Sequence, residues 1–308
     1  MPKELTHWLL AEEAMLSLGG ESHLAATLRE HHELYLAGAV LPDTLLHLFQ
    51  GPHASIALAL ADSFHDAVGD SHAPLLRVEE QFPQGIPMPI LACLLGVISH
   101  MQADIAFHPF VYAVTGADGI SGHYRLETRI DLYLMQAGRI PPVRHLADLV
   151  TPQGRKNLLE VCSLLFDPEG ELPADALSQA LELHIRYQAM YGNLFWQLAA
   201  TLRGWLPVPR FRRQKQLFYP LNLFGNKYEI ENEGRWCCPV SGEQRNVTLA
   251  GLADNAVQRT LELFRLVEQH GSLKTALKGN PGENLLTGLH SIRKYEIKPA
   301  SGSKAAAL

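Results

Sequence analysis

The chain has few of the residues that stabilise secreted proteins or bind nucleic acid. Only four of its 308 residues are cysteine, and none of them forms a C-x-x-C pair. A disulfide framework and a cysteine-based zinc knuckle are therefore excluded, and all four cysteines are expected as buried thiols. Charged residues make up 19% of the chain, the net charge is -6, and long basic tracts are missing. We therefore expect no binding to duplex nucleic acid.

Long hydrophobic runs are scarce as well. The longest candidate, residues 89–101, is shorter than the stretch that crosses a bilayer, so we expect no transmembrane segment. Glu12 and Glu13 interrupt the region in which a signal peptide would need a continuous apolar stretch. A cytoplasmic location is the resulting expectation, whereas the sequence does not specify an oligomeric state.

Strand-like alternation of apolar and polar residues is also rare, and apolar residues recur instead at helical spacing. The fold class is therefore predicted to be all-α, a multi-helix bundle with residues 88–114 at its centre because that stretch is apolar around most of its circumference. The expected helices cover residues 4–18, 22–36, 44–49, 54–66, 88–114, 124–136, 154–165, 174–202 and 249–270.

These patterns predict a division of the chain into two parts. Residues 1–140 are expected to form a metal-binding helical core, and residues 141–300 a helical layer packed on it. Within that layer, residues 207–244 are rich in aromatics, proline and glycine and are predicted to be irregular, with a short hairpin at 231–234. The small, polar tail 301–308 is expected to be disordered.

Histidine is the residue that the chain has in excess. Of 15 histidines, 11 lie at or before residue 123. His100, Asp104 and His108 are spaced by four, so they follow one stripe of an otherwise apolar helix. Such side chains are costly to bury unless a partner such as a divalent cation compensates, and the central carboxylate is suited to bridging two cations. The alternative is a hydrogen-bonded polar stripe without metal.

The pair His123 and Glu127 repeats the same i, i+4 spacing on the next expected helix, so two pairs of ligands can converge inside a bundle. Upstream, His7 lies in the first expected helix, Asp43 follows a proline, and His65 ends another helix. Taken singly, Asp43 is also explained as a helix N-cap and His7 as a partly buried histidine. Six further histidines are assigned to the surface or to a supporting role: His23, His31, His32, His47, His53 and His72. His184 and His290 are expected to bind no metal.

Taken in order, these motifs resemble the zinc-dependent phospholipase C family, which is related to the zinc-dependent single-strand nucleases. The motifs are His7, the stretch Gly38-Ala-Val-Leu-Pro-Asp43, His65, the His100/Asp104/His108 stripe and the His123/Glu127 pair. The resemblance covers roughly the first 130 residues.

The resemblance implies a mainly helical phosphodiesterase with two or three zinc ions. Asp104 would bridge two of them: Asp43, His65 and His100 would complete one ion, and His7 would belong to its neighbour. The third ion would be held by His108, His123 and Glu127. The implied reaction is attack of a metal-activated hydroxide on a phosphodiester, a phospholipid head group or a small soluble compound, with Asp43 and Asp104 as catalytic residues.

Three other readings remain open from the residues alone. His65-Asp66 is the dipeptide of the helical His-Asp metal phosphohydrolases. Metals held by histidine and carboxylate ligands can also connect helices without catalysis, since their binding energy is then folding energy. A carboxylate-bridged di-iron site is the third, although such sites use more glutamates than this chain offers.

Overall fold

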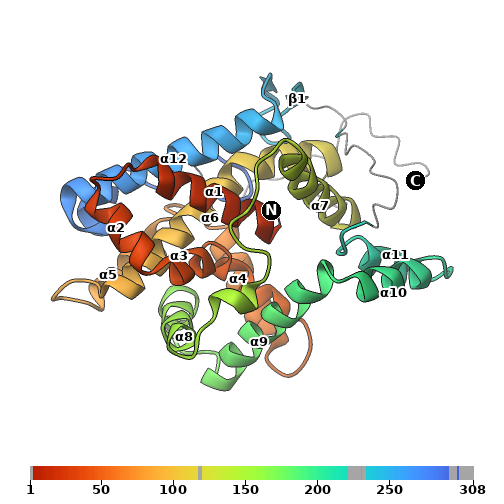
Figure 1. Ribbon diagram of the computed structural model, residues 1–308, viewed down its shortest axis with the longest axis horizontal. Coiled ribbons are helices and arrows are strands. Elements are labelled where there is room, and N and C mark those ends of the chain that lie inside the picture. The colour runs from red at the N-terminus through yellow and green to blue at the C-terminus, as the bar shows by residue number, and fades with distance from the viewer. Residues whose placement is uncertain (1–2, 117–119, 221–229, 231–233, 291–296, 298–308) are drawn as a thin grey trace.

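The computed structural model describes residues 3–116, 120–220, 230, 234–290 and 297. Over these residues the chain is mainly helical with very little strand, which confirms the all-α fold class (Figure 1). The helices are α1 (Glu4–Ser17), α2 (His23–Glu30), α3 (His32–Gly38), η1 (Leu41–His47), α4 (Ala54–His65), α5 (Ala73–Glu80), α6 (Met88–Thr115), α7 (Ile120–Gln136), η2 (Leu146–Leu149), α8 (Pro152–Phe166), α9 (Ala174–Tyr191), α10 (Leu194–Gly204), α11 (Pro209–Lys215), α12 (Leu249–His270) and α13 (Leu273–Leu277).

Helix α6 lies at the centre of the bundle, as its composition predicts. Helices α1, α3, α7, α8 and α12 pack around it, and almost every side chain from Ile90 to Val111 is buried. The expectation that no segment is long enough to cross a membrane needs correction, since this 28-residue helix passes that test of length and composition. Its apolar character is explained by packing, because 94% of its most apolar window is buried inside the protein.

Two glycines allow α3 and α6 to approach each other closely. A Cβ atom at Gly96 would lie 2.0 Å from the carbonyl oxygen of Tyr35, and one at Gly38 would lie 2.1 Å from that of Cys93. Any larger residue would force the two helices apart. This contact brings the end of α3 and the start of η1 next to the middle of α6, where His100 and Asp104 lie.

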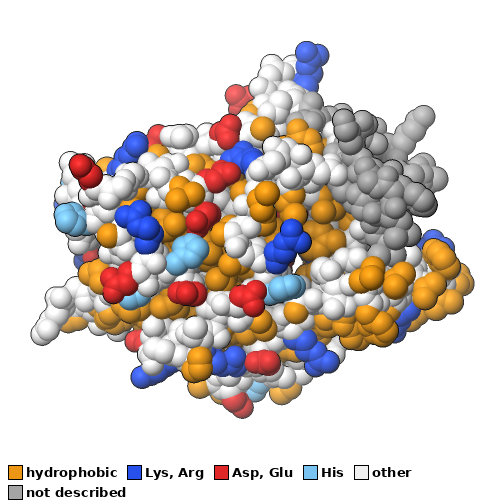
Figure 2. Space-filling view, in the orientation of Figure 1, with side chains coloured by type: hydrophobic (Ala, Val, Ile, Leu, Met, Phe, Trp, Pro, Cys, Tyr) orange, Lys and Arg blue, Asp and Glu red, His pale blue; other side chains and the backbone are white. Residues whose placement is uncertain are grey.

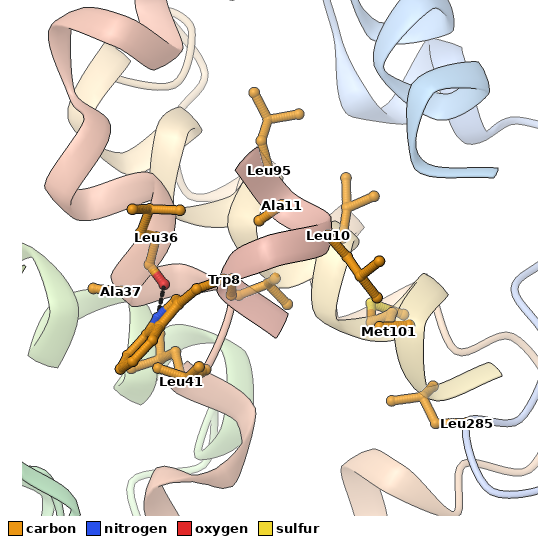
Figure 3. Close-up of a cluster of buried hydrophobic side chains, with 14 of the residues drawn as sticks. Trp8, Leu10, Ala11, Leu36, Ala37, Leu41, Leu95, Met101 and Leu285 are labelled. Atoms are coloured by element: carbon orange, nitrogen blue, oxygen red, sulfur yellow. Dashed lines mark hydrogen bonds between the residues drawn. The ribbon is translucent and has the colours of Figure 1, made fainter. Parts of the chain in front are cut away.

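Helix α1 is held in place by an aromatic side chain next to the metal-ligand candidate His7. Trp8 is fully buried, and its indole Nε1–H donates a 3.0 Å hydrogen bond to the carbonyl oxygen of Leu36 (Figure 3). Leu10 and Ala11 lie on the same helix and face the side of α6 that carries Leu95 and Met101 (Figure 3). A buried tryptophan thus fixes both the position and the rotation of α1, and with them the direction of His7.

The C-terminal half departs from the predicted pattern in three places. The single helix expected over 174–202 is two helices, because Gly192 ends α9 and the Asn193 side chain accepts hydrogen bonds from the first backbone N–H groups of α10. The irregular 207–244 stretch contains α11 and a two-residue ladder between β1 (Trp236–Cys237) and β2 (Gln244–Arg245). The hairpin predicted at 231–234 falls mostly outside the described residues.

Smaller differences concern single residues and short helices. Helix α5 is missing from the predicted set, and the helix expected at 22–36 is divided at His31. Cys237 is exposed, so the expectation of four buried thiols is wrong for this residue. The disordered tail expected at 301–308 lies outside the described residues. Packing of α12 against α6 and α1 joins the two predicted parts in one hydrophobic core, and the boundary at residue 140 stays a prediction.

Candidate metal centre

Five of the eight predicted ligands converge on one buried point, and we call them the central donor cluster. They come from four elements: His7 from α1, Asp43 from η1, His65 from the last turn of α4, and His100 and Asp104 from α6. All five side chains are buried, and the two from α6 are fully so.

Two overlapping sets of potential ligand atoms lie within the central donor cluster. His7, Asp43 and His100 form one set, and His65, His100 and Asp104 form the other; in each, the ligand atoms lie within 4.8 Å of one another. The Nε2 atoms of His7 and His100 lie 3.6 Å and 3.2 Å from the two carboxylate oxygens of Asp104. Nε2 of His65 lies 3.4 Å from Oδ1 of Asp43 and 3.9 Å from Asp104. Asp104 is therefore close to three imidazoles at once.

The facing atoms of this cluster make no hydrogen bonds among themselves. The buried atoms without a hydrogen-bond partner among the described residues include seven from this cluster: both ring nitrogens of His7, Oδ1 of Asp43, Nε2 of His65, Nε2 of His100 and both oxygens of Asp104. Even the 3.2 Å contact from His100 to Asp104 does not have hydrogen-bond geometry. Buried polar atoms are otherwise almost always paired, so a cluster of unpaired nitrogens and oxygens is the arrangement that a shared cation would complete.

Backbone carbonyls fix the opposite nitrogen of three predicted ligands. Nδ1 of His65 lies 2.8 Å from the Ala61 oxygen, and Nδ1 of His100 lies 2.9 Å from the Ala39 oxygen. His108 makes a similar contact of 2.7 Å with the oxygen of Leu285. Because a carbonyl only accepts, each Nδ1 carries a proton, and Nε2 is the nitrogen left to face a metal, as is typical of metal-binding histidines.

The remaining predicted ligands, His108, His123 and Glu127, form a second cluster next to Asp104, which we call the His108 cluster. Nε2 of His123 lies 2.6 Å from Oε1 of Glu127, and the rings of His108 and His123 are 5.9 Å apart between centroids. Nδ1 of His108 is 3.9 Å from Asp104. The structure thus brings all eight predicted residues into two adjoining clusters, while their role as metal ligands stays a prediction.

The protonation of the central donor cluster favours a cation. Burial lowers the pKa of His7 to about 3, so its ring is neutral at physiological pH. Burial alone would raise the pKa of Asp104, but the imidazoles of His100 and His108 outweigh that effect and hold the pKa well below its usual range. His100 and His65 lower the pKa of Asp43 in the same way, against the effect of burial. Both carboxylates are therefore ionised next to a neutral imidazole.

Sequence reasoning missed three residues with comparable chemistry. Glu4, His47 and His184 place one potential ligand atom each within 4.8 Å of one another. From the sequence, His47 is assigned to the surface or to a supporting role and no metal is predicted at His184, but His184 is fully buried and His47 is half-buried. Glu4 lies one turn before His7 on α1, a spacing that could have indicated it; His184 has no such neighbour in the sequence.

A surface cavity lies apart from these clusters. It has a volume of about 530 Å³, and its lining includes Leu5, Arg144, Gln188 and Tyr219 but none of the eight predicted ligands. We therefore do not assign it to the metal chemistry.

Fold and site together define an all-helical protein whose N-terminal half surrounds a buried centre suited to several metal ions. The family model described as zinc-dependent phospholipase C matches residues 6–164, slightly more than half of the chain. The chain belongs to this family. No curated protein and no solved structure gives a match.

The donor set fits the zinc that the family name implies. Zinc is bound by histidine nitrogens and carboxylate oxygens, and the unpaired atoms of the central donor cluster are of these two kinds. The rival His-Asp reading receives no support from Asp66, since its Oδ1 accepts a 2.9 Å hydrogen bond from the side chain of Asn284. None of the donor sets found among the described residues includes Asp66.

Proposed function

We propose that the protein is a phosphodiesterase of phospholipase C type that uses two or three zinc ions to hydrolyse a phosphodiester. The observation that carries this proposal is the central donor cluster: its two donor sets share His100, Asp104 belongs to one set and lies next to His7 of the other, and the facing atoms are unpaired. A site made only to stabilise the fold would be expected to hold one ion with a closed set of ligands. Two adjoining sets around a carboxylate instead match the paired-metal arrangement of phosphoester hydrolases.

The residues of the chain have distinct roles in this reaction. When bound, zinc ions acidify a coordinated water and neutralise charge on the phosphoryl oxygens. His7, His65 and His100 would hold the ions, and Asp104, which belongs to one donor set, also lies 3.6 Å from His7 of the other. Asp43 has an unpaired carboxylate oxygen and a low pKa, so it accepts a hydrogen bond from the attacking water and orients it rather than retaining a proton.

The family membership and the buried centre support a substrate with a phosphodiester linkage, either a phospholipid head group or a small soluble compound.

The first test compares wild-type protein with His100→Ala, Asp104→Ala and His123→Ala on an aryl phosphodiester, with bound zinc measured by elemental analysis. Each variant is expected to lose metal and at least ~100-fold of turnover, in the range of removing one strong transition-state interaction.

His290→Ala is the matched control, since this exposed histidine lies outside both clusters and is expected to keep full zinc content and turnover. Equal turnover in all four variants would contradict the proposal.

A second comparison, of short-chain phosphatidylcholine against the water-soluble glycerophosphodiester without acyl chains, identifies the substrate class. Preference for the lipid indicates phospholipase activity, and preference for the soluble compound indicates a phosphodiesterase of small molecules.

A further inference from the structure

A third group of ligand-type side chains lies beside the central donor cluster, and we call it the Glu4 cluster. It combines Glu4 from α1, His47 from the end of η1 and His184 from α9. His184 lies beyond the residues that the family model matches, and none of the three belongs to the eight predicted ligands. The cluster is therefore a feature of this chain that the family assignment does not explain.

The two histidines present their Nε2 atoms rather than Nδ1. Nδ1 of His47 lies 3.0 Å from the carbonyl oxygen of Asp43, and Nδ1 of His184 lies 3.1 Å from the hydroxyl of Thr44. Nε2 of His184 is buried with no hydrogen-bond partner among the described residues, and it lies 3.9 Å from Oε1 of Glu4. A fully buried imidazole nitrogen that is aimed at a carboxylate and makes no hydrogen bond requires a partner.

The rings also adopt an arrangement found in the neighbouring cluster. His47 and His184 stack with centroids 4.1 Å apart and an interplanar angle of 13°. His7 and His100 stack at the same 4.1 Å with an angle of 11°. The Glu4 cluster thus repeats, one turn of η1 away from Asp43, the geometry that brings two imidazoles to one point in the central donor cluster.

We infer that Glu4, His47 and His184 form an additional binding site for one divalent transition-metal ion. Two histidines and one glutamate are a known ligand set for zinc, with a fourth position open to water. An ion there would connect α1, η1 and α9, and so would tie the C-terminal half to the element that carries Asp43. This inference is independent of the proposed function, because the site can bind metal whether or not the centre hydrolyses phosphodiesters.

The test counts metal ions on purified, zinc-replete protein by elemental analysis. Glu4→Gln, His47→Gln and His184→Gln are each expected to lose one equivalent relative to wild type, whereas Asp104→Asn loses metal from the central donor cluster and keeps that equivalent. In cobalt-substituted protein, the visible absorption of the site should disappear in His184→Gln and persist in Asp104→Asn.

His290→Gln is the control and keeps the wild-type count. Circular dichroism shows which variants are folded; should His184→Gln fail to fold, the half-buried His47→Gln decides the outcome. A folded His47→Gln protein with the wild-type metal count overturns the inference.

A different observation carries a second inference, which concerns the α10–α11 hairpin (residues 194–215). No residue of α10 is buried, and large apolar side chains are exposed along this segment. Trp205 is 72% exposed and Phe195 is 69% exposed. The same surface includes Leu194, Trp196, Leu198, Leu202, Leu206 and Val208. The hairpin lies at one edge of the molecule, where hydrophobic side chains gather (Figures 1 and 2).

The charge of this segment is opposite to that of the whole protein. Residues 194–215 include five arginines and lysines and no aspartate or glutamate, in a chain of net charge -6. Arg212 and Arg213 are exposed, and the guanidinium of Arg203 lies 4.7 Å from the centre of the Phe211 ring. Basic side chains therefore accompany an apolar surface on one short hairpin.

We propose that the α10–α11 hairpin inserts into the surface of a membrane that contains anionic lipid. Exposed apolar patches of this kind mark interaction sites, and tryptophan with leucine beside arginine is the composition of helices that lie in the lipid–water interface. The basic residues select anionic lipid through electrostatic attraction. Binding to lipid is measurable without turnover, so its failure and the failure of the proposed function are distinguishable.

Sedimentation with vesicles tests this inference. Wild-type protein is expected to bind vesicles of phosphatidylcholine with about 30% phosphatidylglycerol, which supplies an anionic surface. It is expected to bind vesicles of pure phosphatidylcholine weakly. Leu202→Glu with Trp205→Glu should abolish binding, and Arg212→Glu with Arg213→Glu should remove the preference for anionic lipid. Ile140→Glu is the matched control, since Ile140 is 70% exposed elsewhere on the surface.

Equal vesicle binding by the Leu202/Trp205 variant and wild type overturns the proposal. Gel filtration provides the other outcome: a dimer that dissociates in the Leu202/Trp205 variant, together with no binding to vesicles, assigns the patch to a second copy of the chain instead.

Discussion

At the scale of single residues, the chain places ionisable side chains in surroundings that fix their charge. His7 and the two aspartates of the central donor cluster are buried; burial keeps His7 neutral, and the neighbouring histidines keep both aspartates ionised. A buried carboxylate outside the two clusters, that of Asp131, also has its charge set by its surroundings. The carboxylate of Asp131 is fully buried and accepts hydrogen bonds from the Thr6 hydroxyl and the Tyr219 hydroxyl, both at 2.5 Å.

Asp131 yields a prediction about pH and stability. Burial raises its pKa from 3.8 to about 6, in spite of its hydrogen bonds to Thr6 and Tyr219. The folded state therefore binds a proton that the unfolded state releases, and the associated stability is complete below pH 4 and is lost as the pH rises through 6. Relative to Asp131→Asn, the free energy of unfolding of wild-type protein should fall by up to about 3 kcal/mol over this range.

Urea unfolding of both metal-free proteins at a series of pH values measures this difference. The variant is the control for every other titrating group, because those groups are common to both proteins. A constant difference between the two from pH 4 to pH 7 would show that Asp131 is ionised throughout in the folded state.

Single residues also separate the two phosphohydrolase readings. Asp66→Asn is expected to keep the wild-type zinc content, because Asp66 contacts Asn284 and lies outside the donor sets found among the described residues. Asp104→Asn is expected to lose metal, because its two oxygens are near three imidazoles. Elemental analysis of both variants provides the measurement; metal loss in Asp66→Asn alone would favour the His-Asp class.

At the scale of helices, contacts between elements place the ligands, and the α3–α6 contact is the tightest of these. Gly96→Ala would place a Cβ atom 2.0 Å from the Tyr35 carbonyl oxygen, so the helices must separate. Separation would also break the contact between His100 and the carbonyl of Ala39, which fixes the His100 ring. We expect a destabilisation of about 1–3 kcal/mol, as for other overpacked sites, together with a loss of zinc affinity.

Thermal denaturation and zinc titration of Gly96→Ala check both effects. Gly20→Ala is the control, because no atom lies within 4 Å of a Cβ at that position. A Gly96→Ala protein with wild-type stability and wild-type zinc affinity would show that the two helices can adjust without moving His100.

Much of this element-level arrangement could be predicted from the sequence, because it depends on local spacing. The stripe of His100, Asp104 and His108 and the pair of His123 and Glu127 follow from helical periodicity alone. Gly192-Asn193 could have indicated the break between α9 and α10, since asparagine is a preferred N-cap. His184 could not have been found in this way, because only the tertiary fold brings α9 to Thr44 and Glu4.

At the scale of the whole molecule, the metal centre joins elements that are distant in sequence. The predicted ligands from α1, η1, α4 and α6 meet at one buried point. Ions bound there would therefore stabilise the fold in addition to any role in catalysis. Removal of metal leaves ionised carboxylates and imidazoles buried together. We therefore expect a chelator to lower the melting temperature by roughly 10 °C, the shift that a few kcal/mol of binding energy gives in a protein of this size.

Differential scanning fluorimetry with and without a zinc chelator measures that shift, and the same chelator saturated with zinc serves as the control. Asp104→Asn, which is expected to bind little metal from the start, should show a much smaller shift. Equal melting temperatures of the wild-type protein with and without chelator would mean that the bound ions contribute nothing to the fold.

One contact of His108 has a consequence for the way the protein is made. The carbonyl that orients this ring belongs to Leu285, and Asn284 beside it bonds the side chain of Asp66. On the ribosome, residues up to Glu127 emerge long before residue 285, so for most of synthesis His108 lacks the acceptor that sets its tautomer. The nascent chain thus contains every predicted ligand early in synthesis. The centre reaches its final form only when Asn284 and Leu285 have packed against Asp66 and His108.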